Sequence, residues 1–253
     1  MFTPEGPTLR ELAVQALSSV EHGYDLLAPK FDRTPFRTPE PLLDAVVRAA
    51  APLGPFRTGL DICCGTGAGV TVLRRLCTER ATGVDFSAGM LAAARAALPG
   101  LPDPAAPPGR SGSPAVDWVR ADARALPFRD AFDLAVSFGA FGHFLPGERP
   151  VLFAQAYAAL RPGGRFVFPV PAPPRVGSAA YWAMWGFDGA MRLRNLLRHP
   201  SFVMYYRTFR LPDVLGDLAG AGFTTGLLPL PELGTRSDGS PRCVLVVATA
   251  AKP

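Results

Sequence analysis

Apolar residues along the chain follow two spacings that alternate. Short apolar runs typical of buried strands occupy 58–62, 80–85, 116–121, 132–138, 164–170, 223–230 and 242–249. Apolar residues three and four positions apart, which are typical of helices, occupy 67–77, 87–98, 148–160 and 213–221. The alternation predicts an α/β fold, with a doubly wound, Rossmann-like sheet of seven mostly parallel strands and helices on both of its faces.

The region before the first predicted strand contains two helical patterns. One covers residues 8–22, and the second runs through "PLLDAVVRAA" to about Ala51. The stretch between them, "GYDLLAPKFDRTPFRTPEP", is rich in proline and is interpreted as irregular. We expect residues 1–52 to form N-terminal helices and a lid.

Two further segments interrupt the alternation. Residues 99–114, "PGLPDPAAPPGRSGSP", predict a long surface loop. Residues 171–211 contain one helical stretch, "AAYWAMWGFDGAMRLRNLLRH", followed by an extended "FVMYYRTF". We interpret 171–211 as an insertion that caps the carboxyl edge of the sheet, within a single domain that spans 1–253.

The composition is that of an ordinary globular protein, with 48% hydrophobic and 19% charged residues. No apolar run is long enough for a transmembrane helix. The first residues carry acids early and lack the basic start and apolar block of a signal peptide. We therefore expect a cytoplasmic protein.

The positive charge is concentrated in one segment. All but two of the 26 basic residues are arginine, and the chain has a formal net charge of +5. Residues 171–211 hold a single acid, Asp188, and the arginines Arg175, Arg192, Arg194, Arg198, Arg207 and Arg210. This segment predicts either a binding surface for an anion or a solvated helix face.

Four cysteines, Cys63, Cys64, Cys77 and Cys243, have no CxxC spacing. The pattern favours neither a disulfide framework nor a zinc site. Neighbouring residues of a strand point to opposite faces, so Cys63 and Cys64 are poorly placed to bind one metal ion together. We expect no metal site.

A glycine-rich turn follows the first predicted strand, in "LDICCGTGAGV". Open α/β sheets bind ligands beyond the carboxyl ends of their strands, and Gly65 and Gly67 let the backbone approach such a ligand closely. The spacing of the glycines does not fit the dinucleotide fingerprint, and the turn lacks the lysine of a phosphate-binding loop.

This turn resembles the first motif of the class I S-adenosylmethionine-dependent methyltransferases, in particular the small-molecule, type 11-like group. Asp61, Cys63, Gly65 and Gly67 occupy the positions of its acid and three glycines, with Cys63 in place of the first glycine. The resemblance implies that these residues wrap the amino-acid part of S-adenosylmethionine, whose product is S-adenosylhomocysteine.

Later segments resemble further motifs of the same family in the same order. In "TGVDFSAGMLAAARAA", Asp85 matches the acid that holds the ribose hydroxyls, and Phe86 and Met90 are expected near the cofactor. The alternative for Asp85 is a helix N-cap, a role that Ser87 fills more naturally. The resemblance further implies that Asp122 and Ala123 meet the adenine ring and that Phe138 lies beside the methyl donor. The "ALRPGGRFVF" segment matches the turn before the fifth strand, and the motifs together span about 58–170.

The sequence specifies the reaction less closely than it specifies the cofactor. His143 follows the fourth predicted strand and is a candidate general base, and the alternative is a histidine that orients its own loop. The tetrapeptide Asp/Asn-Pro-Pro-Tyr/Phe, which marks nitrogen methylation of amides and bases in this family, is absent after that strand.

We expect the acceptor to be a small, partly apolar and anionic molecule. Tyr24 of the lid and Tyr181, Trp185 and Arg194 of the cap are the candidate substrate residues. The alternatives are an RNA or protein methyltransferase that uses the basic cap, and a non-methylating protein that binds S-adenosylmethionine. Nucleic acid is disfavoured because lysine is nearly absent and no second binding module is recognisable. The sequence does not predict an oligomeric state.

Overall fold

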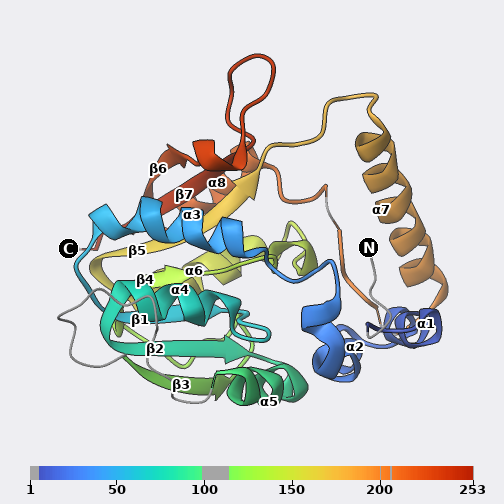
Figure 1. The fold of residues 1–253 in the computed structure, drawn as a ribbon, viewed down its shortest axis with the longest axis horizontal. Coiled ribbons are helices and arrows are strands. Elements are labelled where there is room, and N and C mark those ends of the chain that lie inside the picture. Colours follow the sequence, from blue (N-terminus) through green and yellow to red (C-terminus); the bar gives the residue numbers. More distant parts are fainter. Residues whose placement is uncertain (1–5, 99–113, 200, 206, 253) are drawn as a thin grey trace.

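A seven-stranded mixed sheet forms the centre of the protein (Figure 1). The computed structural model describes residues 6–98, 114–199, 201–205 and 207–252, so nearly all of the predicted loop at 99–114 lies outside the described residues. The strands are β1 (Phe56–Ile62), β2 (Cys77–Asp85), β3 (Ala115–Arg120), β4 (Phe132–Val136), β5 (Leu160–Pro171), β6 (Phe223–Pro229) and β7 (Cys243–Ala250). Their order is β3-β2-β1-β4-β5-β7-β6. Strand β7 is antiparallel to both of its neighbours, and the other pairs are parallel, which confirms the predicted fold class.

Helices cover both faces of the sheet. On one face, α3 (Glu40–Ala50), α4 (Ala68–Leu76) and α5 (Ala88–Ala97) pack in a core that includes Val46, Leu73 and Leu91. On the other face, α6 (Arg149–Ala159) and α8 (Leu211–Gly220) pack in a core that includes Phe153 and Leu218. Burial of apolar surface on both faces explains why the central strands read as continuous apolar runs.

The N-terminal region departs from its prediction. The single helix predicted over 8–22 is two helices, α1 (Leu9–Leu17) and α2 (Val20–Leu27). The side chain of Ser19 accepts a hydrogen bond from the His22 N–H at 3.2 Å and so begins α2. The stretch interpreted as irregular is helical over much of its length, because α2 continues to Leu27 and a 3₁₀ helix follows over Ala28–Arg33. Pro29 lies in the first turn of that helix, where a missing N–H costs nothing.

The inserted segment after β5 forms one long helix, α7 (Ala179–Leu197). Figure 1 shows α7 standing apart from the sheet, beyond the carboxyl ends of the parallel strands, with its C-terminal end near α1. The Arg194 guanidinium donates a hydrogen bond to the carbonyl of Ser18, between α1 and α2, at 3.1 Å. The cap and the N-terminal helices are therefore joined to each other.

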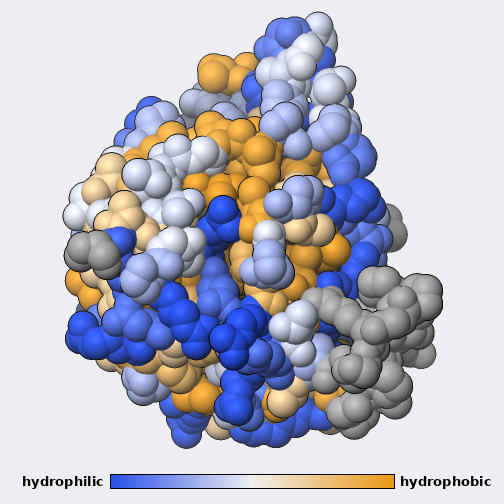
Figure 2. Space-filling model, turned by 90° about the vertical axis from the view of Figure 1, so that its left-hand side faces the viewer, coloured by the Kyte–Doolittle hydropathy of each residue, from blue (hydrophilic) through white to orange (hydrophobic). Residues whose placement is uncertain are grey.

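The opposite side of the molecule, where the C-terminus lies, is shown in Figure 2. Hydrophobic residues gather in the upper and middle part of this face, and hydrophilic residues predominate below them. Among the described residues, no helix combines the length and the apolar character needed to cross a bilayer.

Candidate active site

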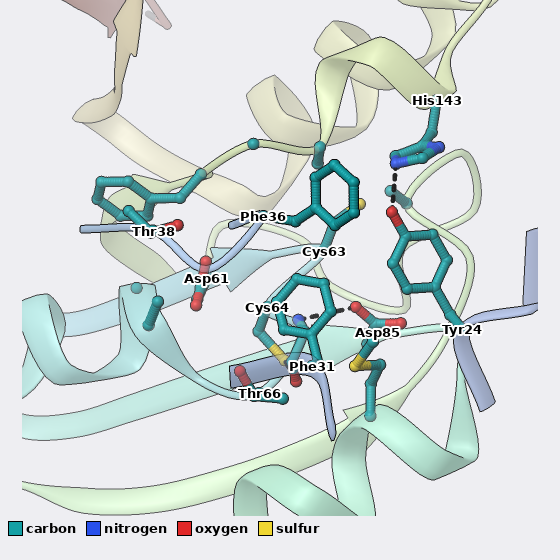
Figure 3. Close-up of a pocket in the computed structure, with 18 of the residues that line it drawn as sticks. Tyr24, Phe31, Phe36, Thr38, Asp61, Cys63, Cys64, Thr66, Asp85 and His143 are labelled. Carbon is teal, nitrogen blue, oxygen red and sulfur yellow. Dashed lines mark hydrogen bonds between the residues drawn. The ribbon is translucent and has the colours of Figure 1, made fainter. Parts of the chain in front are cut away.

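A cavity of about 840 Å³ opens where strands β1, β2 and β4 end. Its walls come from the turn after β1, the ends of β2 and β4, the N-terminal helices and the segment that follows α7. Figure 3 shows Asp61, Asp85 and the rings of Tyr24, Phe31 and Phe36 around the same space. All ten residues expected to bind the cofactor line this cavity: Asp61, Cys63, Gly65, Gly67, Asp85, Phe86, Met90, Asp122, Ala123 and Phe138.

The turn after β1 has a backbone that glycine favours. Cys63, Gly65 and Gly67 have φ angles of 58°, 52° and 96°, in the left-handed region. A Cβ at Gly65 would meet no atom within 4 Å, whereas one at Gly67 would come within 2.9 Å of Leu98. Gly65 therefore presents bare backbone to the cavity. Cys63 adopts a conformation that non-glycine residues rarely take, at the position where the motif that it resembles has glycine.

Asp61 is buried at the end of β1 and faces α4. A Cβ on Gly69 would lie 2.4 Å from its carboxylate, so only glycine allows the first turn of α4 to come this close. The backbone N–H groups of Gly69 and Val70 donate to Asp61, yet its Oδ2 atom has no hydrogen-bond partner among the described residues. Burial, and then the charge of Asp85, raise the pKa of Asp61 well above its usual value. The free oxygen is a site for a hydrogen-bond donor or a cation.

Asp85 ends β2 and accepts a hydrogen bond from the Gly65 N–H at 2.9 Å (Figure 3). It also accepts one from the Ser87 N–H at 2.9 Å. Burial raises its pKa. Ser87, not Asp85, begins α5, because its hydroxyl accepts from the Met90 N–H at 3.0 Å. The carboxylate of Asp85 thus has lone pairs left for hydroxyl donors in the cavity.

Asp122 lies in the loop after β3. The guanidinium of Arg124 donates to both of its carboxylate oxygens, at 2.7 to 3.2 Å, and this pair lowers the pKa of Asp122. Ala123 is buried beside it. Asp122 therefore remains ionised and is available to accept a hydrogen bond.

The N-terminal segment is fastened over the cavity by two carboxylates. Asp25 of α2 accepts from the Ser87 hydroxyl at 2.6 Å and from the Gly89 N–H at 2.8 Å. Asp32 of the 3₁₀ helix accepts from the Thr66 hydroxyl, in the turn after β1, at 2.7 Å. Neither contact was predictable from the sequence, because Asp25 and Asp32 both fall in the stretch interpreted as irregular.

Tyr24 and His143 form a pair in the wall of the cavity. The Tyr24 hydroxyl and His143 Nε2 lie 2.7 Å apart (Figure 3). His143 Nδ1 lies 2.7 Å from the carbonyl of Val203. A carbonyl only accepts, so Nδ1 carries the proton and Nε2 accepts from the tyrosine. Shielding from water lowers the pKa of His143, which keeps the ring neutral. Both ring nitrogens are occupied, so His143 reaches a ligand in this arrangement through the Tyr24 oxygen.

The candidate substrate residues of the cap lie elsewhere. Tyr181, Trp185 and Arg194 are not among the described residues that line the cavity. Trp185 Nε1 donates to the Tyr181 hydroxyl at 3.1 Å, and Arg194 is engaged by Ser18. The cap contributes Ser201, Val203 and Met204 from the segment after α7 instead.

The expectation of an anionic acceptor finds no support in the cavity. None of the six arginines of 171–211 is among the described residues of its lining. The arginines that do line it, Arg37 and Arg124, are paired with Glu40 and Asp122. The arginines of 171–211 lie outside this lining because charge density along a sequence does not fix the direction in which side chains point.

Apolar side chains form much of the remaining wall, including several that the sequence analysis did not single out: Phe31, Phe36, Phe144, Leu145 and Met204. The two phenylalanines of the lid lie among prolines that broke the apolar spacing, which left no periodic signal. No cluster of three or more metal-binding side chains occurs in the part of the chain that the structure describes.

The donor set fits S-adenosylmethionine. The unpartnered Oδ2 of Asp61 suits a cationic amino group, and the bare backbone of Gly65 suits a closely held chain. The buried carboxylate of Asp85 suits vicinal hydroxyls, since a carboxylate accepts and does not donate.

Comparison with known proteins agrees with this geometry. A family model described as a methyltransferase domain matches residues 60–168. The ubiquinone/menaquinone biosynthesis C-methyltransferase UbiE of Desulfotalea psychrophila is 34% identical over 172 residues, which cover 65% of this chain and 64% of that protein. The 2-phytyl-1,4-naphtoquinone methyltransferase of Thermosynechococcus vestitus is 28% identical over 130 residues, or 51% of this chain and 52% of that protein.

The chain thus matches between half and two thirds of the length of these relatives. Among solved structures, the magnesium protoporphyrin IX methyltransferase of Synechocystis PCC 6803 with bound SAH superposes with a TM-score of 0.52 at 16% identity, over 82% of this chain and 81% of that one. That likeness concerns the fold. The domain match, the strand order and the cofactor-binding turn together identify residues 60–168 as a class I S-adenosylmethionine-dependent methyltransferase domain.

Proposed function

We propose that this protein transfers the methyl group of S-adenosylmethionine to a small, apolar, hydroxylated aromatic acceptor of the quinol type, at a ring carbon. The names of the two curated relatives support a quinone-derived acceptor. The apolar and aromatic wall of the cavity supports it independently of those names.

In this proposal the residues at the ends of β1, β2 and β3 hold the cofactor. Asp61 takes the amino group, Asp85 the ribose hydroxyls, and Asp122 with Ala123 the adenine edge. S-adenosylmethionine supplies a methyl group on a positively charged sulfur, which needs a nucleophile in line with the carbon–sulfur bond. Phe138, at the end of β4, lies in the wall of the same cavity and borders the acceptor.

The acceptor lies against Phe31, Phe36, Leu145 and Met204. Carboxylates outnumber arginines among the described residues of the cavity, and both arginines are paired. No arginine of the lining is left to pair with an anionic acceptor, whereas a neutral aromatic ring needs no such partner. We therefore propose a neutral acceptor.

Tyr24 and His143 activate the acceptor. A phenol becomes a far better carbon nucleophile when it loses its proton. The Tyr24 oxygen takes the acceptor's O–H proton as its own proton passes to Nε2 of His143. Val203 holds the imidazole in the tautomer that leaves Nε2 free to receive it. The ring carbon then takes the methyl group as the carbon–sulfur bond breaks, which leaves S-adenosylhomocysteine. The hydrogen of that ring carbon moves as a proton to the acceptor's oxygen and restores the aromatic ring, and His143 later releases to water the proton that it took.

The observation that carries the proposal is a Tyr–His pair in an apolar cavity that also contains the cofactor-binding turn. The test offers the protein methyl-labelled S-adenosylmethionine with a short-chain prenylated naphthoquinol that lacks the ring methyl. A catechol carboxylate and total RNA are the comparison acceptors. We expect label only in the naphthoquinol, at carbon by mass spectrometry.

Labelling of the catechol carboxylate alone would refute the neutral-acceptor proposal. Labelling of RNA would favour the alternative that uses the basic cap, although no cap arginine lies on the cavity. Cofactor binding without any transfer would favour a non-methylating protein.

A further inference from the structure

Helix α7 exposes a row of large apolar side chains. Trp182, Leu196 and Leu197 are 61%, 79% and 71% exposed, and Trp185 and Leu193 are also exposed. Positions 182, 185, 193 and 196 are separated by three, eight and three residues, which places them along one side of an α-helix. An ordinary solvated helix would carry charged side chains on that side.

Polar contacts fix the other side of α7 to the protein, so its orientation is not arbitrary. Asn195 donates to the carbonyl of Phe202 at 3.0 Å and accepts from the Phe202 N–H at 2.9 Å. Arg194 bonds to the carbonyl of Ser18, and Asp188 and Met191 are buried. The helix is anchored by its polar side and presents its apolar side outward.

Exposed arginines lie on α7 and in the segments that flank it. Arg175 precedes α7, Arg192 and Arg198 lie on it or at its end, and Arg207 follows it; all four are exposed. The Arg207 guanidinium lies 3.8 Å from the ring centre of Trp185. The single acid of the segment, Asp188, is buried and accepts a hydrogen bond from the Arg207 N–H. No exposed carboxylate of this segment offsets the positive charge.

We propose that this face of α7, with these arginines, docks on an anionic lipid bilayer. Tryptophan, leucine and arginine on one helix side are the chemistry of an interfacial helix, in which the apolar chains enter the acyl region and the guanidinium groups meet the phosphates. A second copy of the chain is a poorer occupant, because a symmetric contact would bring the same arginines of both copies together.

The segment that follows α7 reaches the cavity, although no described residue of α7 itself lines it. Ser201, Val203 and Met204, which directly follow α7, line it, and α1 and α2 lie at the C-terminal end of the helix (Figure 1). A docked protein could therefore receive a lipophilic acceptor from the bilayer without passing it through water. This last step rests on the proposed function, whereas docking itself does not.

The test measures sedimentation of the intact protein with large unilamellar vesicles, one set of phosphatidylglycerol and phosphatidylcholine and one of phosphatidylcholine alone. We expect binding to the anionic vesicles, at least about fivefold weaker for each arginine lost, and a steep decrease with salt. Tryptophan emission should shift to the blue on binding, since Trp182 and Trp185 leave water.

Two pairs of variants locate the surface. Leu196→Ser/Leu197→Ser should weaken vesicle partitioning by about tenfold or more. Arg192→Gln/Arg198→Gln should weaken it by about 25-fold, since two fivefold losses multiply. The matched controls, Val151→Ser/Leu227→Ser and Arg95→Gln/Arg129→Gln, change exposed residues elsewhere and should bind as the unmodified protein does.

Absence of vesicle binding, or binding that the α7 variants leave unchanged, would overturn the proposal. A dimer that Leu196→Ser/Leu197→Ser dissociates, without vesicle binding, would assign the face to a second copy. Affinity for S-adenosylhomocysteine and transfer to a water-soluble quinol, measured on the same variants, should be unchanged. If docking is present and transfer to quinols is absent, the proposed function fails and the docking surface stands.

Discussion

Replacing Tyr24 with phenylalanine removes one hydroxyl and little else, since the ring and its packing remain. In the structure that hydroxyl is the donor to Nε2 of His143, at 2.7 Å, and His143 is held from its other side by Val203. The variant leaves Nε2 without this partner in a site shielded from water. Loss of a buried hydrogen-bond partner costs about 1–3 kcal/mol in the free energy of unfolding.

The effect on catalysis should be larger. A positioned acid or base contributes about 10²- to 10⁴-fold to a rate, so we expect kcat of Tyr24→Phe to fall by that factor. KM for the quinol and the affinity for S-adenosylhomocysteine should change little, because the ring still packs in the wall. Steady-state transfer of labelled methyl groups gives kcat and KM, and calorimetric titration gives the affinity. Tyr157→Phe, a change in α6 away from the cavity, is the matched control.

The pH profile separates a catalytic pair from a structural one. Neutral His143 is required to receive the proton, and its pKa lies below the usual 6.5. The rate should therefore stay level through neutral pH and decline only below that value, and this acid limb should vanish in Tyr24→Phe. Retention of kcat within about threefold of the unmodified protein would refute the relay, given the size expected for general base catalysis. Loss of cofactor affinity with kcat unchanged would instead assign the pair to holding the lid.

Three further predictions test the cofactor site. Asp85→Asn should weaken S-adenosylhomocysteine binding by about 1–3 kcal/mol in calorimetry, and unchanged affinity would contradict the ribose assignment. Gly69→Ala, whose Cβ would lie 2.4 Å from the Asp61 carboxylate, should lower the free energy of unfolding by about 1–3 kcal/mol, whereas Gly216→Ala, at an open helical position, should raise it by about 0.5–1 kcal/mol. Burial raises the pKa of both Asp61 and Asp85, so ionisation destabilises the free protein as pH rises through these values. S-adenosylhomocysteine should therefore raise Tm more at pH 8 than at pH 5.5, and an equal shift at both would argue against an amino group beside Asp61.

The order of strands and helices was predictable because burial acts locally on the chain. A strand buried on both faces must be apolar throughout, and a helix against a sheet must be apolar every three or four residues. The cofactor-binding turn was recognisable for a similar reason. Gly65 and Gly67 meet a requirement of their own backbone, a positive φ, that a sequence displays directly.

The N-terminal helices were predicted less well. Ser19 divides one apolar pattern into two helices by capping the second, and Pro29 begins a 3₁₀ helix where proline was taken as a sign of irregular structure. In both places a local signal had two meanings. The helical conformation is the one that lets α2 pack against α5, where Asp25 accepts a hydrogen bond from the Gly89 N–H.

The sequence by itself determined the sheet, the glycine turn and the carboxylates that follow the strands, since each depends on neighbours close along the chain. Only the tertiary structure decided which side chains stand beside the cofactor-binding residues and can act on an acceptor. Tyr24 and His143 are 119 positions apart, and they meet because α2 and the loop after β4 close on the same cavity. Tertiary packing also turned the arginines of the cap away from the cavity and left the apolar side of α7 outward. Side-chain direction follows from contacts between distant elements, which residue spacing does not encode.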